Sequence, residues 1–203
     1  MIGIITAKSG NIGSIINVLR YLKKKYVFIE KKSQINNINK LILPGVGSFK
    51  NLKKNLISLN LFDELKKFIL NDKNYFLGIC IGMQILLSKG TEEGTENGLN
   101  IFEGIVKNFN SVKKVKVPNI NWKKLKIKQN CRILRDHDPL NQYYFLHSYF
   151  CEIADTKHVI ATSDYKGIEF PCIIKKKNIY GIQFHPEKSN LQGLNIVKNF
   201  CEL

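Results

Sequence analysis

Phe76-Leu77-Gly78-Ile79-Cys80-Ile81-Gly82-Met83-Gln84 is the stretch from which the architecture of this chain is inferred. An apolar run ends on a cysteine that has a glycine two residues to either side, which predicts a buried strand turning sharply into a helix over about residues 81–88. Small neighbours permit the tight, strained turn of a nucleophile elbow, and N–H groups at a helix start favour the thiolate. Because cysteine is often simply buried, a structural cysteine between packing glycines stays open as the alternative.

Short apolar strands alternate with helical periodicity before this stretch. The pattern predicts an α/β protein with a central, mostly parallel sheet flanked by helices, in which sites gather at the carboxyl ends of the strands. Cys80 and the turn Pro44-Gly45-Val46-Gly47-Ser48 both follow predicted strands, so we expect them to lie close together. The predicted strands are 1–6, 26–29, 41–43 and 75–79, and the predicted helices are 12–24, 49–57 and 61–70.

The pattern changes after a polar, glycine-rich loop predicted over residues 89–98. Short strand-like runs follow, some separated by turn signals, and residues 190–200 have helical spacing. We interpret this half as an antiparallel or mixed extension of the same sheet. The strand-like runs are 101–109, 114–117, 133–134, 143–148, 159–162, 170–174 and 179–184.

Length and composition indicate one cytoplasmic domain over residues 1–203. The chain is long enough for one core, has no apolar run that could span a bilayer, and opens with too short an apolar run for a signal peptide. Its five cysteines are widely spread without a C-x-x-C pair, which favours neither a disulfide framework nor a zinc site. We expect no metal and no cofactor.

A formal net charge of +16 raises the question of nucleic-acid binding. The lysines occur almost everywhere in small groups, and no nucleic-acid motif accompanies them. A compositional bias toward Lys, Asn and Ile explains the charge most simply, and a basic docking face for an acidic protein partner is the alternative. We expect neither nucleic-acid nor membrane binding.

A second group of polar residues stands in Gly181-Ile182-Gln183-Phe184-His185-Pro186-Glu187-Lys188-Ser189, where a strand again enters a turn before a helix. A histidine can move the proton of a thiol, and a nearby carboxylate can hold the imidazole in one orientation, as in catalytic triads. His185 and Glu187 lie more than a hundred positions after Cys80, so only the fold can bring them together. Taken singly, His185 is more simply explained as a packed or capping residue, and Glu187 as a glutamate at a helix start.

Several blocks together resemble one family. PGVG at 44–47, GICIGMQ at 78–84, KVP at 116–118, FLHSY at 145–149 and GIQFHPEKS at 181–189 are similar, in this order, to the glutamine amidotransferase subunits of imidazole glycerol phosphate synthase. These are class I triad glutaminases of histidine biosynthesis. The resemblance covers the whole chain and implies a single-domain class I glutamine amidotransferase fold, with Cys80, His185 and Glu187 as the catalytic triad.

The resemblance also implies roles for other residues. A cysteine nucleophile attacks L-glutamine, and the ammonia passes to a cyclase subunit of (β/α)8-barrel fold in a heterodimer. The expected oxyanion donors are backbone N–H groups of Gly45, Val46, Gly47 and Ile81. The expected substrate-binding residues are Gln84, Glu93, Ser148 and Tyr149, and the expected partner-facing residues are Asn11, Pro118, Ile120, Trp122 and Lys188.

Two blocks depart from the family pattern. The family's first turn resembles Asp-Tyr-Gly-x-Gly-Asn, whereas this chain has Thr6-Ala7-Lys8-Ser9-Gly10-Asn11. After KVP the family has His-x-Gly-Trp, whereas this chain has Asn119-Ile120-Asn121-Trp122. Both blocks are assigned to the partner-facing side. They leave two alternatives open, a paralogue that supplies ammonia for amidino-sugar synthesis in surface glycans and a catalytically silent scaffold subunit.

Overall fold

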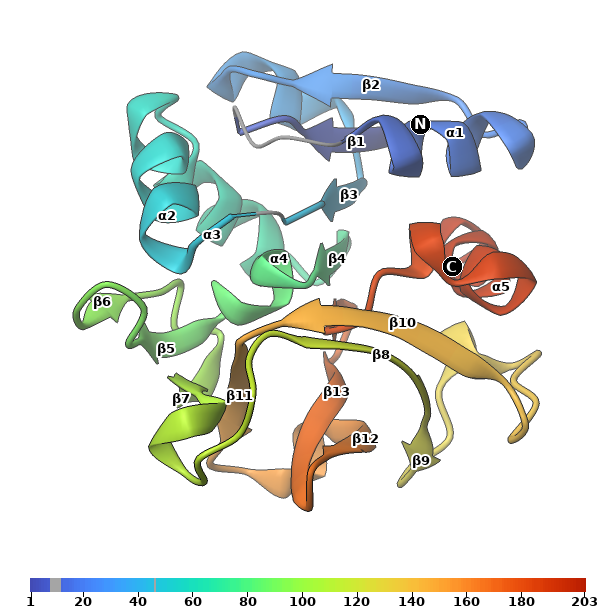
Figure 1. Ribbon diagram of the computed structural model, residues 1–203. Helices are drawn as coiled ribbons and strands as arrows, with labels where there is room; N and C mark the ends of the chain where they lie inside the picture. Colours follow the sequence, from blue (N-terminus) through green and yellow to red (C-terminus); the bar gives the residue numbers. More distant parts are fainter. Residues whose placement is uncertain (8–11, 46) are drawn as a thin grey trace.

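An eight-stranded mixed sheet forms the centre of the protein, whose computed structural model describes residues 1–7, 12–45 and 47–203 (Figure 1). The strand order is β2-β1-β3-β4-β14-β13-β12-β9. The first five are parallel neighbours, and the last three extend the sheet in antiparallel fashion. The strands are β1 (Ile2–Ile5), β2 (Tyr26–Ile29), β3 (Lys40–Leu43), β4 (Tyr75–Ile79), β9 (Lys126–Ile127), β12 (Val159–Tyr165), β13 (Ile168–Lys176) and β14 (Ile179–Ile182).

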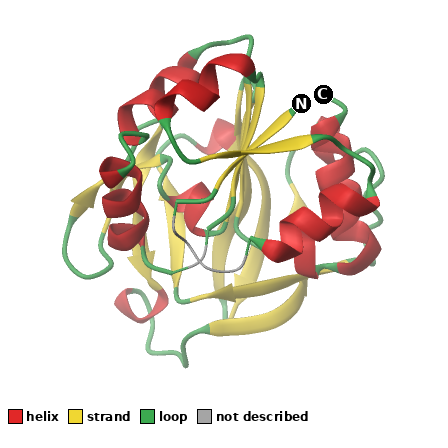
Figure 2. Cartoon of the chain, turned by 90° about the horizontal axis from the view of Figure 1, so that it is seen from above, coloured by secondary structure: helices red, strands yellow, loops and turns green. Residues whose placement is uncertain are grey.

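Helices cover both faces of the parallel part of the sheet (Figure 2). α1 and α5 pack together on one side, and α2 and α3 on the other (Figure 1). With both faces covered, β1 and β14 bury every residue, which is why they are continuous apolar runs in the sequence. The helices are α1 (Gly13–Tyr21), α2 (Phe49–Ser58), α3 (Phe62–Leu70), the one-turn α4 (Ile81–Gln84) and α5 (Asn190–Cys201).

Two smaller sheets pack beside this framework. One is an antiparallel pair of β8 (Asn119–Lys124) and β10 (Gln142–His147), which runs as a curved ribbon below α4 and β4 in Figure 1. The other has the order β11-β7-β5-β6, from β11 (Tyr149–Ile153), β7 (Phe102–Asn108), β5 (Leu87–Gly90) and β6 (Glu96–Asn97). The second half of the chain therefore extends the main sheet only in part, because Ser148 directs the chain from the ribbon into a third sheet.

Four local predictions were wrong. The loop predicted at 89–98 contains the end of β5 and the short strand β6. The helix after Cys80 ends at Gln84 and the chain enters β5, because residues 81–87 are all buried and show no helical alternation of exposed and buried positions. The strand predicted at 114–117 is irregular, and β8 begins at Asn119 instead. Residues 133–134 belong to the 3-10 helix η3 (Arg132–Leu134). The other 3-10 segments are η1 (Lys32–Asn37), η2 (Phe109–Ser111), η4 (Thr156–His158) and η5 (Pro186–Lys188).

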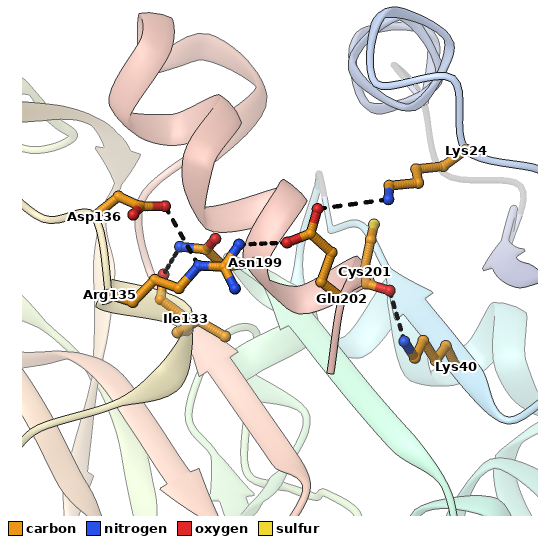
Figure 3. Close-up of polar contacts among 8 residues, drawn as sticks. All are labelled: Lys24, Lys40, Ile133, Arg135, Asp136, Asn199, Cys201 and Glu202. Carbon is orange, nitrogen blue, oxygen red and sulfur yellow. Dashed lines mark hydrogen bonds and ion pairs between the residues drawn. The ribbon is translucent and has the colours of Figure 1, made fainter.

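The end of α5 is tied to both halves of the molecule (Figure 3). Its contacts reach the segment after α1, the start of β3 and the segment around η3, so the last turn links these parts of the molecule. Two of these contacts are partly exposed ion pairs of Glu202, each of which contributes at most about 1 kcal/mol to stability. The contacts join Lys40 Nζ to the Cys201 carbonyl at 2.6 Å, Asn199 Nδ2 to the Ile133 carbonyl at 3.2 Å, Lys24 to Glu202 at 3.7 Å, and Arg135 to Glu202.

Within the described ranges, no helix has the length and apolar character needed to cross a bilayer.

Candidate active site

Cys80 sits at a strained turn between β4 and α4. Its φ of 53° and ψ of −109° lie in a region that non-glycine residues rarely adopt. A side chain at Gly78 would approach the Gly82 carbonyl oxygen to 2.1 Å, and one at Gly82 would approach the Leu43 oxygen to 2.1 Å. Both positions therefore require glycine, and the geometry is that of the elbow inferred from the sequence.

The turn after β3 packs directly against this elbow. A side chain at Gly45 would lie 2.4 Å from the Gly82 nitrogen and 2.7 Å from the Ile79 oxygen, so the two backbones touch there. The strand-end argument predicts this proximity. Gly45, Gly47 and Ile81 all line the same cavity as Cys80, with Gly47 at a φ of 100°. Val46 lies outside the described residues.

His185 and Glu187 reach the elbow from the neighbouring strand. β14 pairs in parallel with β4, so that Ile182 lies beside Ile79 and the chain that follows ends next to Cys80. His185 Nδ1 lies 2.8 Å from Glu187 Oε1, and both side chains are buried. Burial disfavours the imidazolium, but hydrogen bonding and charge interactions with Cys80 and Glu187 outweigh it and raise the pKa of His185 above its ordinary value. These contacts favour the imidazolium form of His185 beside the sulfur.

A cavity of about 250 Å³ opens in front of Cys80 and His185. Ligand pockets commonly measure roughly 300–1,000 Å³, so this volume suits a ligand of amino-acid size. A larger open groove of about 1,030 Å³ lies between η1 and the start of α3. Its described lining residues include neither a cysteine nor a histidine. The cavity is lined by Gly45, Gly47, Cys80, Ile81, Gln84, Glu92, Pro118, Leu146, His147, Ser148, Tyr149, His185 and Lys188.

Gln84 is fully buried at the cavity wall. Its Nε2 donates to the Tyr149 carbonyl at 3.0 Å and to Gln183 Oε1 at 3.0 Å. Its Oε1 has no hydrogen-bond partner among the described residues. A buried acceptor without a partner is costly, so this oxygen is available to a donor on a ligand.

Gln183 is a site residue that the sequence reasoning missed. It is fully buried, and its Nε2 lies 3.6 Å from Cys80 Sγ. Because α4 has only one turn, fewer aligned peptide dipoles act on the sulfur than the predicted two-turn helix would supply. Gln183 and His185 supply polar contacts there instead. The sequence did contain a signal for Gln183, because it stands two residues before His185, and residues two apart in an extended segment lie on the same face.

Glu93 is not placed at the cavity, which its neighbour Glu92 lines instead. Glu93 is exposed at a φ of 57°, a turn conformation that directs the two side chains differently. Glu92 Oε2 accepts a hydrogen bond from the Phe49 N–H at 2.7 Å. Burial raises the pKa of the Glu92 carboxyl, against the opposing effect of that hydrogen bond.

The predicted partner-facing residues divide into two groups. Pro118 and Lys188 line the cavity, and the Lys188 ammonium lies 5.9 Å from the Tyr144 ring centroid. Ile120 and Trp122 are exposed on β8, at 53% and 41% of their surface. Asn11 lies outside the described residues. The structure thus places exposed apolar side chains on the ribbon that borders the cavity.

Comparison with known proteins accounts for this constellation. The model of the family described as glutamine amidotransferase class-I matches residues 4–203. The chain belongs to this family. The family prediction from the sequence motifs is confirmed.

Relatives of known name align with this amidotransferase chain over nearly its whole length. Proteins named imidazole glycerol phosphate synthase subunit HisH are 39% identical in Leptospira borgpetersenii, where all of both chains is covered, and 40% identical in Pelagibacter ubique, where 98% of each is covered. A solved structure titled glutamine amidotransferase superposes with a TM-score of 0.72 at 16% identity, covering 100% of this chain and 99% of that one. The predicted single-domain class I fold is confirmed.

Across the described ranges, no three His, Cys, Asp or Glu side chains gather closely enough to hold a metal ion.

Proposed function

We propose that this chain hydrolyses L-glutamine at Cys80 and delivers the ammonia to a cyclase subunit of (β/α)8-barrel fold, as the amidotransferase subunit of imidazole glycerol phosphate synthase in histidine biosynthesis. The observation that carries the proposal is the junction of Cys80 with the buried His185–Glu187 pair at one cavity. The names of the full-length relatives support the pathway. Histidine biosynthesis is cytoplasmic chemistry, so we assign the protein to the cytoplasm.

The first half-reaction forms a thioester. The Cys80 thiolate attacks the carboxamide carbon of glutamine, and the carbonyl oxygen becomes an oxyanion. Gly45, Gly47 and Ile81 line the same cavity, and their backbone N–H groups are the candidate donors to this oxyanion, with Val46 a candidate by family resemblance alone. One such donor is worth about a hundred- to a thousandfold in rate. The carbon–nitrogen bond then breaks, and His185 gives its proton to the departing ammonia.

The second half-reaction regenerates the thiolate. Water attacks the glutamyl thioester, and His185, now neutral, accepts a proton from it. The carbon–sulfur bond breaks, which releases glutamate and returns Cys80 to its thiolate form. Glu187 holds the Nδ1 side of the imidazole throughout and stabilises the imidazolium.

Substrate binding is assigned to other residues that line the cavity. Gln84 Oε1, which has no partner among the described residues, is the proposed acceptor for the α-ammonium of glutamine, and Ser148 and Tyr149 line the same cavity. The Glu92 carboxyl replaces Glu93 in our assignment, because only Glu92 lines the cavity.

The partner is assigned to the face formed by β8 and the cavity mouth. Ile120 and Trp122 offer exposed apolar surface there, Pro118 and Lys188 border the opening, and Asn11 is included by family resemblance alone. An aromatic anchor of this kind commonly dominates an interface. If the basic charge assists docking, the affinity for the cyclase falls as salt rises. A flat response to salt would leave the charge as compositional bias.

Labelling of the nucleophile tests the chemistry. A glutamine-like electrophile is expected to label Cys80 alone, because Cys80 lines the cavity, whereas burial raises the pKa of each of the other four thiols. Cys80→Ala is expected to lose both labelling and glutamine turnover, whereas Cys131→Ala, at a half-buried cysteine outside the cavity, keeps them. Labelling that persists in Cys80→Ala would overturn the assignment and favour a scaffold subunit.

Reconstitution tests the pathway. The chain is mixed with the histidine-pathway cyclase and its ribonucleotide substrate, or with a barrel from a glycan-modifying pathway. Glutamine turnover is expected to rise with the first. The altered Asn119–Trp122 block gives the second a specific basis, and stimulation only by the glycan-pathway barrel would transfer the assignment to that alternative.

A further inference from the structure

Two buried side chains face each other across the β8–β10 ribbon beside the active site. Asn119 opens β8 and His147 ends β10, and they are direct partners in the antiparallel register. Asn119 is fully buried and His147 is 6% exposed. Asn119 belongs to the block that departs from the family pattern, as does Asn121 on the same side of the strand.

The hydrogen bonds of these side chains fix which atom donates in each pair. The Tyr149 carbonyl can only accept, so His147 Nδ1, at 2.8 Å from it, carries the proton. Burial lowers the pKa of His147 to about 4, which leaves the ring neutral and its Nε2 an acceptor. Asn119 Nδ2 donates to that Nε2 at 3.1 Å, and Asn119 Oδ1 accepts from Asn121 Nδ2 at 2.8 Å.

The same Tyr149 carbonyl orients Gln84. It accepts a second hydrogen bond from Gln84 Nε2 at 3.0 Å, and the other hydrogen of that nitrogen goes to Gln183 Oε1. With both hydrogens engaged, the Gln84 amide cannot turn over. Its Oε1 is left without a partner in the described structure, at a residue that lines the cavity.

We propose that Asn119 and His147 are positioning residues that hold the Tyr149 carbonyl, and through it the Gln84 amide, so that Gln84 Oε1 faces a hydrogen-bond donor of the substrate. Asn121 sets the direction of the Asn119 amide. The proposal rests on the proposed glutaminase function, because the hydrogen-bond donor is then the α-ammonium group of the substrate glutamine. It predicts that the Asn119–Asn121 pair affects substrate affinity and leaves the chemical steps at Cys80 unchanged.

Asn119→Asp tests the direction of the chain with almost no change in shape. A carboxylate cannot donate to His147 Nε2, so that nitrogen must gain a proton or lose its partner. In the complex with the cyclase, we expect the 15N NMR signal of His147 Nε2 to change from acceptor type to donor type. We expect the KM for glutamine to rise about tenfold or more while kcat stays within about threefold.

Asn199→Asp is the matched control. Asn199 is also buried and also donates its Nδ2 to a backbone group, the Ile133 carbonyl, but it lies on α5 away from the cavity. It is expected to lose stability, with the His147 signals and the KM for glutamine unchanged. Asn121→Ala is the milder second variant if Asn119→Asp fails to fold, and we expect it to raise KM about two- to fivefold by loosening the Asn119 amide.

Three outcomes would overturn the proposal. These are an acceptor-type Nε2 in Asn119→Asp, an unchanged KM in both the 119 and 121 variants, or an equal rise in KM in Asn199→Asp. A wild-type chain that neither turns over glutamine nor labels at Cys80 would refute the proposed function instead. The NMR signals of His147 would still test the positioning chain in that case.

Discussion

Two buried histidines line one cavity, one on the wall that follows β14 and the other on the wall formed by β10, and their pKa values are shifted in opposite directions. His185, at the end of the parallel strand β14, contacts Glu187 at 2.8 Å, and its pKa is raised. His147, at the end of the antiparallel strand β10, contacts a neutral carbonyl and a neutral amide, and its pKa is lowered to about 4. The difference lies in the partners, because burial opposes the charged form of both rings.

The contrast divides the labour between the two walls. The wall with His185 holds the charged groups to which we assign the bond-breaking and bond-forming steps. The wall with His147 is neutral and ringed by Phe109, Phe145 and Phe170, with centroids 5.2–5.8 Å from the imidazole. The positive charge of His185 further disfavours a second cation there, which helps to lower the pKa of His147. One charged and one neutral histidine can therefore share a cavity without exchanging roles.

Removing the carboxylate from the charged wall is expected to have the largest effect. Glu187→Gln keeps the shape but deprives the His185 imidazolium of its counter-charge. We expect kcat for glutamine to fall about a hundred- to ten-thousandfold, as in comparable triads. We also expect an NMR titration to show the pKa of His185 moving downward toward the behaviour of His147.

Glu202→Gln is the control for that experiment. Glu202 also pairs with a cation, Arg135, but at the end of α5 (Figure 3). Its substitution is expected to leave kcat within about twofold. A Glu187→Gln variant that keeps nearly full activity would mean that the two walls do not differ in the way their partners imply.

The sequence predicted the charged wall better than the neutral one because its determinants are local. Cys80 with its flanking glycines, and His185 with Glu187, each occupy one short block that ends a buried strand. Parallel pairing of β4 with β14 then brings the blocks together. Topology and residue pattern were therefore sufficient.

The neutral wall depends on a register that the sequence does not reveal. Asn119 faces His147 only because β8 begins at Asn119, whereas a strand was predicted at 114–117. Asn119 and Asn121 look like solvent-facing residues in an alternating strand, and the Asn119–His147 pairing explains why Asn119 is buried. Glu92 was missed for a similar reason, since a turn at Glu93 decides which carboxylate points inward.

The pH dependence of the unfolding free energy is expected to distinguish His147 from His185, with an effect of intermediate size among these predictions. Between about pH 6.5 and 4 the unfolded chain protonates His147 while the folded chain does not, so stability falls as pH falls through this window. The loss from this group is at most roughly 3 kcal/mol. His185 has a raised folded pKa, so its contribution is complete below the unfolded value and is lost only as pH rises above it.

Chemical denaturation at several pH values measures this difference. The gap in unfolding free energy between wild type and His147→Gln is expected to narrow as pH falls from 6.5 to 4. His158→Gln serves as the control, because His158 also contacts a backbone carbonyl, that of Lys175, but is less buried. A gap that is constant with pH would show that His147 is not held neutral by the fold.

The outer face of the neutral wall is expected to give the smallest change in stability. Trp122 alternates with Asn121 on β8 and points outward, with 41% of its surface exposed and its ring 5.7 Å from that of Tyr144. Trp122→Ala should therefore lower the unfolding free energy by less than about 1 kcal/mol, whereas truncating a core aromatic costs about 3–5 kcal/mol. Because Trp122 is the proposed interface anchor, the same substitution should nevertheless weaken cyclase binding by about tenfold or more, measured by calorimetry.

Leu140→Ala is the control. Leu140 is 73% exposed on a turn, and its substitution should alter neither the unfolding free energy nor the affinity for the cyclase. A loss of stability as large as that of a core aromatic in Trp122→Ala would assign the ring to packing, and an unchanged affinity would place the partner elsewhere. The two measurements together therefore decide whether the β8–β10 ribbon, which orients Gln84 on its inner side, also binds the cyclase on its outer side.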